Sequence, residues 1–300
     1  MPTDRLEIKV PGSIANLGPG FDTLAVAVQL YLRLSVRIAP GENKLDFRFV
    51  SGQPDGDNCI ERAFRFVAQQ RGESFPSLIV RVESDIPMKA GLGSSAAATV
   101  AGLRLYEAIA GAQPEQGLLN AASALEHHPD NVAASLLGGL AISCQLPDRS
   151  VFAMRLPWPD ELAFIVLTPH LALSTSTSRE VLPEYVSRED AVFNLQRVAL
   201  LLEALHAGDF SLLREALRDR LHQPFRQKLV PGLEQILALE HPDLLGVCLS
   251  GAGPSIVALA RGNFVGIERL LIEAFRPTGF ECTIRRLHAH QDAPAALLVT

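Results

Sequence analysis

The segment IPMKAGLGSSAAA, residues 86–98, leads directly into an alanine-rich run that ends near Ala110. Apolar residues recur in this run at helical spacing and alanine has the highest helix propensity, so a helix is predicted over 94–110. The glycines of the segment let backbone amides approach a ligand, its serines add hydroxyl donors, and a helix N-terminus offers unpaired N–H groups. This pattern favours an anion-binding turn; a small-residue turn with a serine helix cap is the alternative.

Two well-known phosphate-binding fingerprints do not account for this segment. Gly91, Gly93 and Ala96 have the spacing of the dinucleotide motif, but residues 83–90 separate Gly91 from the preceding predicted strand at 78–82. That motif also needs an acidic residue at the end of a second strand about 20 residues later, where this sequence predicts more helix. No GxxxxGK[ST] segment occurs either. A phosphate bound here would be held by a different architecture.

Composition excludes several other classes of protein. The chain has 300 residues, of which 48% are hydrophobic and 20% charged, so it can bury a large core and is not a disordered sequence. The 27 basic and 33 acidic residues give a net charge of −6, and no dense Lys/Arg run occurs. A nucleic-acid or anionic membrane surface is therefore not expected, and a small-molecule partner is favoured.

Neither a membrane span nor a secretory signal is predicted. The longest apolar run, from Leu24 to Leu34, is interrupted by Gln29 and Arg33, and residues 1–10 alternate charged and apolar side chains. A cytoplasmic protein is expected. The cysteines have no paired spacing, which predicts buried free thiols rather than a disulfide framework or a zinc site; they are Cys59, Cys144, Cys248 and Cys282.

The remaining pattern divides the chain into two α+β units. Pro157 and Pro159 mark the predicted boundary, which gives domains 1–156 and 157–300. Strands are predicted at 6–10 (ended by Pro11-Gly12), 24–38, 45–50, 78–82, 140–144, 151–156, 162–168, 245–249, 255–260 and 280–287. Besides 94–110, helices are predicted at 60–70, 121–125, 190–206, 210–221 and 264–275.

Five segments carry a resemblance that covers the chain from Pro11 to about Leu259. The segments PGSIANLGPGFD (11–22), IPMKAGLGSSAAA (86–98) and LSGAGPS (249–255) closely resemble, in order and separation, the three motifs of the GHMP small-molecule kinases. The middle motif is shared by the whole superfamily. Three segments resemble more specifically the branch that phosphorylates L-homoserine: ANLGPGFD (15–22) within the first motif, HPDNVAASLLGG (128–139) and PFRQKLVPG (224–232).

The resemblance implies a fold and an activity. It implies an N-terminal ATP-binding GHMP domain of the ribosomal S5 domain 2-like type at 1–156 and a ferredoxin-like C-terminal GHMP domain at 157–300. The implied reaction is the ATP- and Mg²⁺-dependent phosphorylation of the L-homoserine hydroxyl to O-phospho-L-homoserine, a step of threonine biosynthesis. No nucleic-acid or membrane partner is implied, and the choice between monomer and homodimer stays open.

Positions that match family residues on the nucleotide side follow from the same resemblance. Ser95 and Glu126 match a metal-associated hydroxyl and carboxylate, which suits Mg²⁺ because this ion takes few protein oxygen ligands and keeps waters. The implied ATP-binding residues are Asn58, Pro87, Met88, Lys89, Ala90, Gly91, Leu92, Gly93, Ser94, Ser95, Ala96 and Ala97.

On the substrate side, each end of homoserine has a matching group. Arg179 and Arg226 match the arginines that clamp the substrate carboxylate and the neighbouring phosphate. Asp22 suits the ammonium, and Asn16 suits the reacting hydroxyl. His128 matches a substrate-side histidine. The catalytic residues implied are Asn16, Arg179 and Asp130; since a loose transition state needs little early deprotonation, we expect Asp130 not to act as a true base.

Three alternatives remain beside this interpretation. One is a GHMP-type kinase for another small alcohol or amino acid, such as mevalonate or a diphosphocytidyl erythritol, although paired arginines with Asp22 favour a zwitterion. Another is a catalytically silent nucleotide sensor, which would have lost the metal and substrate residues. The third is a dinucleotide-dependent oxidoreductase, which the missing strand and acid disfavour.

Overall fold

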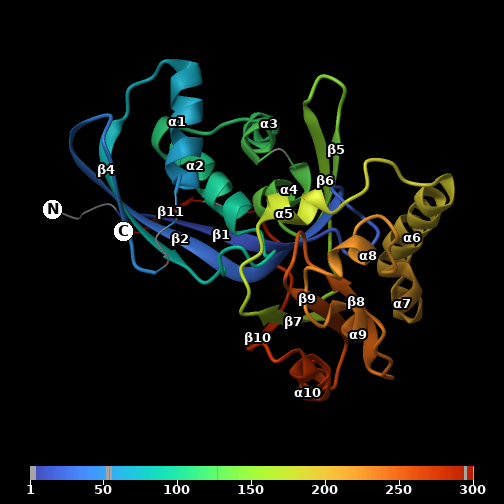
Figure 1. Cartoon of the computed structure of the whole chain (residues 1–300). Helices are drawn as coiled ribbons and strands as arrows, with labels where there is room; N and C mark the ends of the chain where they lie inside the picture. The colour runs from blue at the N-terminus through green and yellow to red at the C-terminus, as the bar shows by residue number, and fades with distance from the viewer. Residues whose placement is uncertain (1–4, 52–53, 55, 127, 294–295, 300) are drawn as a thin grey trace.

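The computed structural model shows two sheets with helices packed around them (Figure 1). The structure describes residues 5–51, 54, 56–126, 128–293 and 296–299. The first sheet contains β1 (Arg5–Ala15), β2 (Leu24–Glu42), β3 (Leu45–Phe49), β4 (Pro76–Ser84), β5 (Leu140–Gln145), β6 (Val151–Leu156) and β11 (Ala296–Val299). Its order is β11-β1-β2-β4-β3, and β5 branches from β2 to pair with β6.

Strand β1 is longer than predicted, because Pro11-Gly12 does not end it. The strand continues to Ala15, which pairs with Ala25 of β2, and the register shifts between Pro11 and Gly12. A β-bulge of this kind accommodates the proline without ending the ladder. At Gly12 a Cβ would lie 2.8 Å from the Leu92 carbonyl oxygen, so the glycine lets the 86–98 segment lie against the strand.

Four helices lie over one face of this sheet (Figure 1). They are α1 (Cys59–Arg71), α2 (Ser94–Ala110), α3 (Glu115–Glu126) and α4 (Pro129–Leu137). Helix α2 begins and ends where the sequence predicts, and its residues Val100, Leu103 and Tyr106 are buried. Helix α4 was not predicted: it has only nine residues, too few for a helical period to stand out, and most are buried.

The second sheet has ferredoxin-like topology. It consists of β7 (Ala163–Pro169), β8 (Leu244–Leu249), β9 (Ile256–Ala260) and β10 (Cys282–Leu287) in the order β10-β7-β9-β8, with every pair antiparallel. A helical segment, residues 175–237, lies between β7 and β8, and α10 (Phe264–Phe275) connects β9 to β10. The ferredoxin-like unit expected after residue 157 is therefore present.

This sheet is buried on both faces, and the two faces belong to different cores. Phe164 and Val166 of β7 join the main core, which also contains the first sheet and its helices, whereas Ile165 and Leu167 join a second core with α10. Because side chains alternate along a strand, one sheet can serve both cores. The second sheet thus packs against the N-terminal unit through a shared hydrophobic core.

The segment between β7 and β8 differs most from its prediction. It contains α5 (Thr175–Glu180), α6 (Arg188–Ala207), η1 (Phe210–Leu212), α7 (Leu213–Ala216), α8 (Gln223–Arg226) and α9 (Leu233–Leu237); η2 (Arg276–Thr278) follows α10. The helix predicted at 210–221 is wrong beyond Ala216. There the buried Asp219 carboxylate accepts hydrogen bonds from the backbone N–H groups of residues 221–223, which replaces helical bonding with a turn.

The end of the chain returns to the first sheet. Gln29 N–H donates to the His288 carbonyl, His290 N–H donates to the Ala27 carbonyl, and β11 pairs with β1. Residues 288–290 and β11, predicted to belong to the second domain, therefore pair with the N-terminal sheet. No local sequence signal marks this return, since it depends on an edge strand that is distant along the chain.

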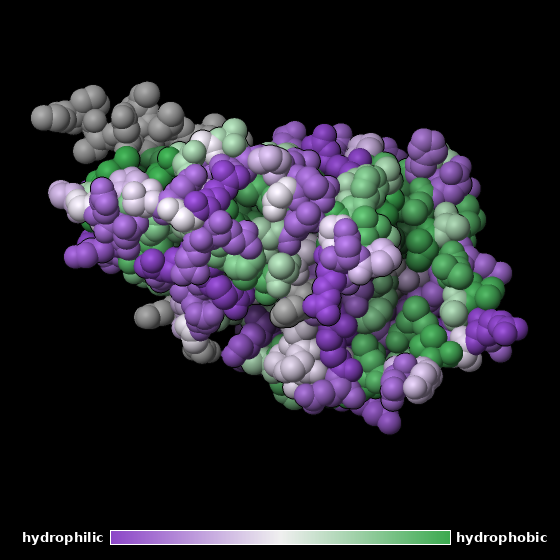
Figure 2. All heavy atoms as spheres, turned by 90° about the horizontal axis from the view of Figure 1, so that it is seen from above, coloured by the Kyte–Doolittle hydropathy of each residue, from purple (hydrophilic) through white to green (hydrophobic). Residues whose placement is uncertain are grey.

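Two expectations about the surface have different outcomes. Over the described residues, no helix has the length and apolarity that crossing a bilayer requires. The four cysteines are free, but only Cys248 is buried, and Cys144 is exposed. Figure 2 shows hydrophilic residues over most of the surface seen from above, with apolar residues gathered toward the end where Figure 1 places α6 and α7.

Candidate active site

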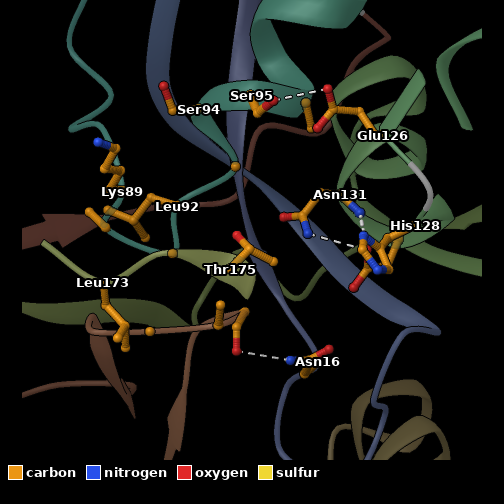
Figure 3. Close-up of a pocket in the computed structure, with 18 of the residues that line it drawn as sticks. Asn16, Lys89, Leu92, Ser94, Ser95, Glu126, His128, Asn131, Leu173 and Thr175 are labelled. Carbon is orange, nitrogen blue, oxygen red and sulfur yellow. Dashed lines mark hydrogen bonds between the residues drawn. The ribbon is translucent and has the colours of Figure 1, made fainter. Parts of the chain in front are cut away.

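A cavity of about 400 Å³ lies where the two units meet. This volume is in the range of small-ligand sites. Figure 3 shows its wall: Ser95 and Glu126 lie at one end, Asn16 at the other, and Asn131 and His128 between them. It is lined by Asn16, Phe21, Asp22, Lys89, Ala90, Gly91, Leu92, Gly93, Ser94, Ser95, Ala96, Glu126, His128, Asp130, Asn131, Leu173, Thr175, Arg179, Arg226, Gly251, Ala252 and Gly253.

Three successive carbonyls of the 86–98 segment accept hydrogen bonds from other parts of the chain. The Ala90 carbonyl accepts from Ser255 N–H at 3.2 Å, and the Leu92 carbonyl accepts from Ser13 N–H at 3.1 Å. Between them, the Gly91 carbonyl accepts from Ser250 Oγ at 2.6 Å. With its carbonyls held by β1 and the 249–255 segment, the loop has a fixed shape at the N-terminus of α2, whose first N–H groups have no partner within the helix.

The glycines of this loop are required by packing. A Cβ on Gly91 would lie 2.4 Å from the Ser250 carbonyl oxygen, and a Cβ on Gly93 would lie 2.1 Å from Ser13 Oγ. Both residues have φ above +70°, the left-handed region that glycine adopts most readily. The glycines therefore let β1 and the 249–255 segment close against the loop, in addition to any approach by a ligand.

A hydroxyl and a carboxylate meet at the start of α2. Ser95 Oγ donates to Glu126 Oε1 at 2.9 Å (Figure 3). Thr99 Oγ1 donates to the same oxygen at 2.7 Å. Arg62 Nη2 lies 3.4 Å from it. Glu126 is the last residue of α3, and its side chain contacts the beginning of α2.

The left-handed turn at Asn16 holds both ends of its amide. Asn16 Nδ2 donates to the Gly251 carbonyl at 3.1 Å, and its Oδ1 accepts from Asp22 N–H at 3.1 Å. Asn16 and Asp22 have φ values of 70° and 52°. Asparagine and aspartate tolerate this conformation better than most residues, which explains their presence in this turn. The turn thereby places the Asp22 carboxylate in the cavity wall.

Asp22 pairs with an arginine from the other unit. Arg179 Nη2 of α5 lies 2.6 Å from Asp22 Oδ1, and each side chain is 33% exposed. The Phe21 ring lies close to two guanidinium groups, because the Cζ atoms of Arg179 and Arg226 are each 5.4 Å from its centroid. The aromatic ring and the carboxylate together hold two cations side by side.

Arg226 is a buried cation whose hydrogen-bond acceptors, among the residues that the structure describes, are all neutral. Its Nε donates to the Ser178 carbonyl at 3.1 Å, and its Nη1 donates to the Gly251 carbonyl at 3.0 Å. Burial, followed by the charge of Arg179, lowers the pKa of Arg226 to about 10, so it remains charged near neutral pH. A guanidinium in this state is suited to bind an anion that enters the cavity.

Asp130 is 2% exposed and lies at the first turn of α4. Asn131 donates to its Oδ1 from the backbone at 2.7 Å and from the side chain at 3.2 Å, and Ser13 Oγ donates to Asn131 Oδ1. Burial, followed by the charge of Asp22, raises the pKa of Asp130 to about 6. The carboxylate is thus held rigidly and is harder to ionise than an exposed one.

Most of the residues implied by the resemblance line this cavity, and four do not. Asn58, Pro87, Met88 and Ala97 are absent from its lining. The Asn58 side chain caps α1, where its Oδ1 accepts from Ile60 N–H at 3.1 Å, and it borders a separate surface hollow. A role for these four residues in ATP binding stays a prediction.

The lining also contains residues that the sequence analysis did not single out. Phe21 and Asn131 lie beside Asp22 and Asp130 within motifs already quoted, so adjacency to a motif was the available signal. Thr175 lies outside the quoted segments, four residues before Arg179. Leu173 has no comparable signal. The 251–253 backbone borders the cavity because β8 and β9 bring the 249–255 turn to it.

Comparison with protein families and solved structures agrees with this architecture. Residues 58–139 match the GHMP kinases N terminal domain, and residues 201–264 match the GHMP kinases C terminal domain. A crystal structure of homoserine kinase from Cytophaga hutchinsonii has a TM-score of 0.87 at 25% identity, covering 99% of this chain and 98% of that one. A mevalonate kinase structure shares the fold, with a TM-score of 0.70 at 12% identity. The two-domain GHMP fold implied by the motifs is confirmed.

Curated relatives cover nearly the whole chain. Homoserine kinase from Moorella thermoacetica is 39% identical over 289 residues, covering 93% of this chain and 96% of the relative. Homoserine kinase from Solibacter usitatus is 40% identical over 278 residues, covering 91% and 90%. A homoserine kinase from Thermus thermophilus is 41% identical over 263 residues, covering 87% and 88%. Identity at this level, together with both family domains, shows that the chain belongs to the homoserine kinases within the GHMP kinase family.

Proposed function

We propose that this protein transfers the γ-phosphoryl group of ATP to the hydroxyl of L-homoserine, giving O-phospho-L-homoserine and ADP, a step of threonine biosynthesis. The observation that carries the proposal is one cavity with two chemically different ends. Its first end is the anchored glycine loop at the N-terminus of α2, which suits a polyphosphate. Its other end pairs Asp22 with two arginines, which suits a zwitterion.

Each group of L-homoserine has a partner of matching charge in this arrangement. Its carboxylate would lie against Arg226 and Arg179, and its ammonium against Asp22. Since Asp22 and Arg179 already form an ion pair, the two charged ends of the substrate would bind to the two members of that pair. The Asn16 amide, held by Gly251 and Asp22, would receive the hydroxyl. His128 of the cavity wall would complete the substrate side.

The residues at the start of α2 fit a magnesium ion. Ser95 Oγ and Glu126 Oε1 are 2.9 Å apart and both are oxygen donors. Mg²⁺ takes few protein oxygen ligands and keeps several waters, so these two oxygens suit it. Bound there with ATP, Mg²⁺ would neutralise charge on the phosphate oxygens.

Catalysis in this proposal rests on positioning and charge. Asn16 holds the hydroxyl toward the phosphate end of the cavity, while Arg179 and the α2 N-terminus neutralise charge around the transferring group. Asp130 is a charged wall residue whose Oδ1 already accepts two hydrogen bonds from Asn131, and we assign it a positioning rather than a proton-accepting role.

A coupled assay of ADP formation tests the proposal against rival substrates. The panel contains L-homoserine, 4-hydroxybutyrate (no ammonium), 3-amino-1-propanol (no carboxylate), mevalonate and L-threonine, each with and without Mg²⁺. An absent charged end leaves buried charges unpaired, so kcat/KM should fall on the order of a hundredfold or more for 4-hydroxybutyrate and 3-amino-1-propanol. L-threonine keeps both ends but misplaces the hydroxyl, and should lose turnover more than binding.

The same panel can contradict the proposal. Equal kcat/KM for L-homoserine and either 4-hydroxybutyrate or mevalonate would exclude a zwitterion site and leave a GHMP-type kinase for another alcohol. ATP binding without ADP formation from any panel member would favour a nucleotide sensor. Activity unaffected by removal of divalent ions with a chelator would exclude the metal assignment at Ser95 and Glu126.

A further inference from the structure

His222 is a fully buried imidazole that the proposed mechanism does not yet use. It lies at the start of α8 and is 0% exposed, with both ring nitrogens engaged. Nε2 lies 2.8 Å from the Gly18 carbonyl oxygen, in the turn that carries Asn16 and Asp22. Nδ1 lies 3.0 Å from Nη1 of Arg226. The ring therefore connects the first motif to the buried guanidinium.

These two contacts fix the tautomer of the ring. A carbonyl oxygen can only accept, so Nε2 carries the proton and donates to Gly18. A guanidinium N–H can only donate, so Nδ1 is unprotonated and accepts from Arg226. Protonation of Nδ1 would remove this acceptor and set a second cation against Arg226. Arg226 and a neutral His222 are therefore compatible in this geometry, whereas Arg226 and an imidazolium are not.

The surroundings of His222 support the neutral form. Asp219 Oδ2 lies 3.5 Å from Nε2, but that carboxylate already accepts from backbone N–H groups of its own turn, and its Oδ1 accepts from Asn194 Nδ2. Burial lowers the pKa of His222, although the charge of Asp219 opposes this effect. The charge of Asp22 raises this pKa to a smaller extent than that of Asp219, and Phe21 stacks on the ring with centroids 5.2 Å apart.

We propose that His222 is a positioning residue for substrate recognition: as a neutral Nε2–H imidazole, it holds the Arg226 guanidinium in the orientation that receives the substrate carboxylate. Arg226 Nη1 then has two acceptors, Nδ1 of His222 and the Gly251 carbonyl, and the latter also accepts from Asn16. The carboxylate clamp and the hydroxyl-binding amide are thereby built on one network. The inference rests on the proposed function, because it assumes that Arg226 binds the substrate carboxylate.

Two substitutions separate the roles of the two ring nitrogens. In His222→Asn, the amide oxygen can occupy the place of Nδ1 and accept from Arg226, whereas in His222→Gln the amide nitrogen can replace Nε2 and donate to Gly18. His206→Asn, at the exposed end of α6, is the matched control. For each protein, KM for L-homoserine, KM for ATP and kcat are measured, with the thermal midpoint recorded to confirm folding.

The Arg226-directed role predicts a specific division of effects. KM for L-homoserine should rise about tenfold or more in His222→Gln, since a hydrogen bond to a charged group is lost, and should stay within about threefold of wild type in His222→Asn. KM for ATP should not change in either. An equal rise in KM for L-homoserine in the two variants at wild-type thermal midpoints, or a parallel rise in KM for ATP, would show that His222 contributes only to packing.

A measurement on the unmodified protein keeps the inference testable if a variant does not fold. Nitrogen-15 NMR of histidine-labelled protein distinguishes a protonated from an unprotonated ring nitrogen, and His222 should be the Nε2–H tautomer from pH 6.5 to 8. An imidazolium or an Nδ1–H tautomer in this range would overturn the proposal. If instead the wild-type protein phosphorylates no L-homoserine, the proposed function fails first, and the NMR result still reports the His222–Arg226 contact.

Discussion

At the scale of single residues, Asp130 links burial to pH-dependent stability. Burial, and after it the charge of Asp22, raises the pKa of Asp130 to about 6, from an unfolded value near 3.8. The native state therefore holds this proton between about pH 4 and 6 while the unfolded state has released it. The contribution of Asp130 to the free energy of unfolding is fully present below pH 4 and is lost as pH rises through 6.

Replacing Asp130 with Asn should remove this decrease in the free energy of unfolding at neutral pH. Asn keeps an oxygen to accept from Asn131 and has no charge to bury, so the variant should be more stable than wild type at pH 7 by up to about 3 kcal/mol. The difference should shrink toward zero as pH falls to 4. Urea unfolding at four pH values checks this, with exposed Asp46→Asn as control. A stability difference that does not vary with pH would contradict the pKa assignment.

The same substitution separates positioning from proton transfer. If Asp130 removed the hydroxyl proton, Asp130→Asn would abolish the acid limb in the pH profile of kcat. Because Asn131 already holds its Oδ1 and a loose phosphoryl-transfer transition state needs little early deprotonation, we expect a reduced kcat that keeps the limb. The profile between pH 5 and 9, measured at saturating ATP and L-homoserine, decides between the two roles.

Gly93 is a residue at which steric packing and ligand approach can be distinguished. A Cβ there would lie 2.1 Å from Ser13 Oγ in a left-handed conformation, so Gly93→Ala should destabilise the fold by about 2 kcal/mol or more. Removing the clashing atom with Ser13→Ala should recover part of this loss, which a double-mutant cycle on the free energy of unfolding measures. Strictly additive effects would show that the two positions do not meet, and unchanged stability in Gly93→Ala would contradict the packing argument.

At the scale of elements, the junction of α3 with α2 carries the metal assignment. Glu126→Gln keeps the shape of the side chain but removes the charge opposite Ser95, so turnover should fall by about a hundredfold or more and the Mg²⁺ concentration for half-maximal rate should rise. Mg²⁺ titration of kcat tests this. Glu115→Gln, at the exposed beginning of α3, should behave as wild type. Wild-type metal dependence in Glu126→Gln would leave the carboxylate with the structural role of binding Ser95 and Thr99.

Elements with strong local signals were predictable, and elements defined by distant contacts were not. Helix α2 follows from its alanine content and period, and β7 and β9 from short apolar runs. Helix α4 is nearly all buried and too short to show a period, and the helix predicted at 210–221 stops at Ala216 because Asp219 bonds the backbone ahead of it. Local patterns do not include such competing side-chain acceptors.

The candidate site shows the same division between local and distant information. The family resemblance indicated Asn16, Asp22, Glu126, Arg179 and Arg226, and the structure places all five in one cavity. His222 was not indicated: a histidine four residues before Arg226 has no special pattern, and its role depends on Gly18, some 200 residues earlier in the chain. Residues that orient a binding group therefore need the tertiary structure, even when the group itself can be read from a motif.

At the scale of the whole molecule, the shared core predicts one cooperative unit. The main core joins Phe164, Val257 and Leu287 of the second sheet to Ile8 and Leu34 of the first, and the Asp22–Arg179 pair crosses between the units at the cavity. Separating the second unit would therefore uncover the apolar sheet face that carries Phe164 and Val257. Unlike two domains joined only by a linker, these units should not unfold separately.

Calorimetry on the full chain should accordingly show a single transition. L-homoserine at about 100 times its Kd should raise the free energy of unfolding of the whole protein by about 2.7 kcal/mol and move the entire transition to higher temperature. 4-Hydroxybutyrate at the same concentration is the control and should move it less, because Asp22 loses its ammonium partner. Two transitions, of which L-homoserine shifts only one, would show that the units unfold independently and that one of them contributes most of the binding energy. A single transition shifted equally by both compounds would keep the shared core but remove the ammonium from recognition at Asp22.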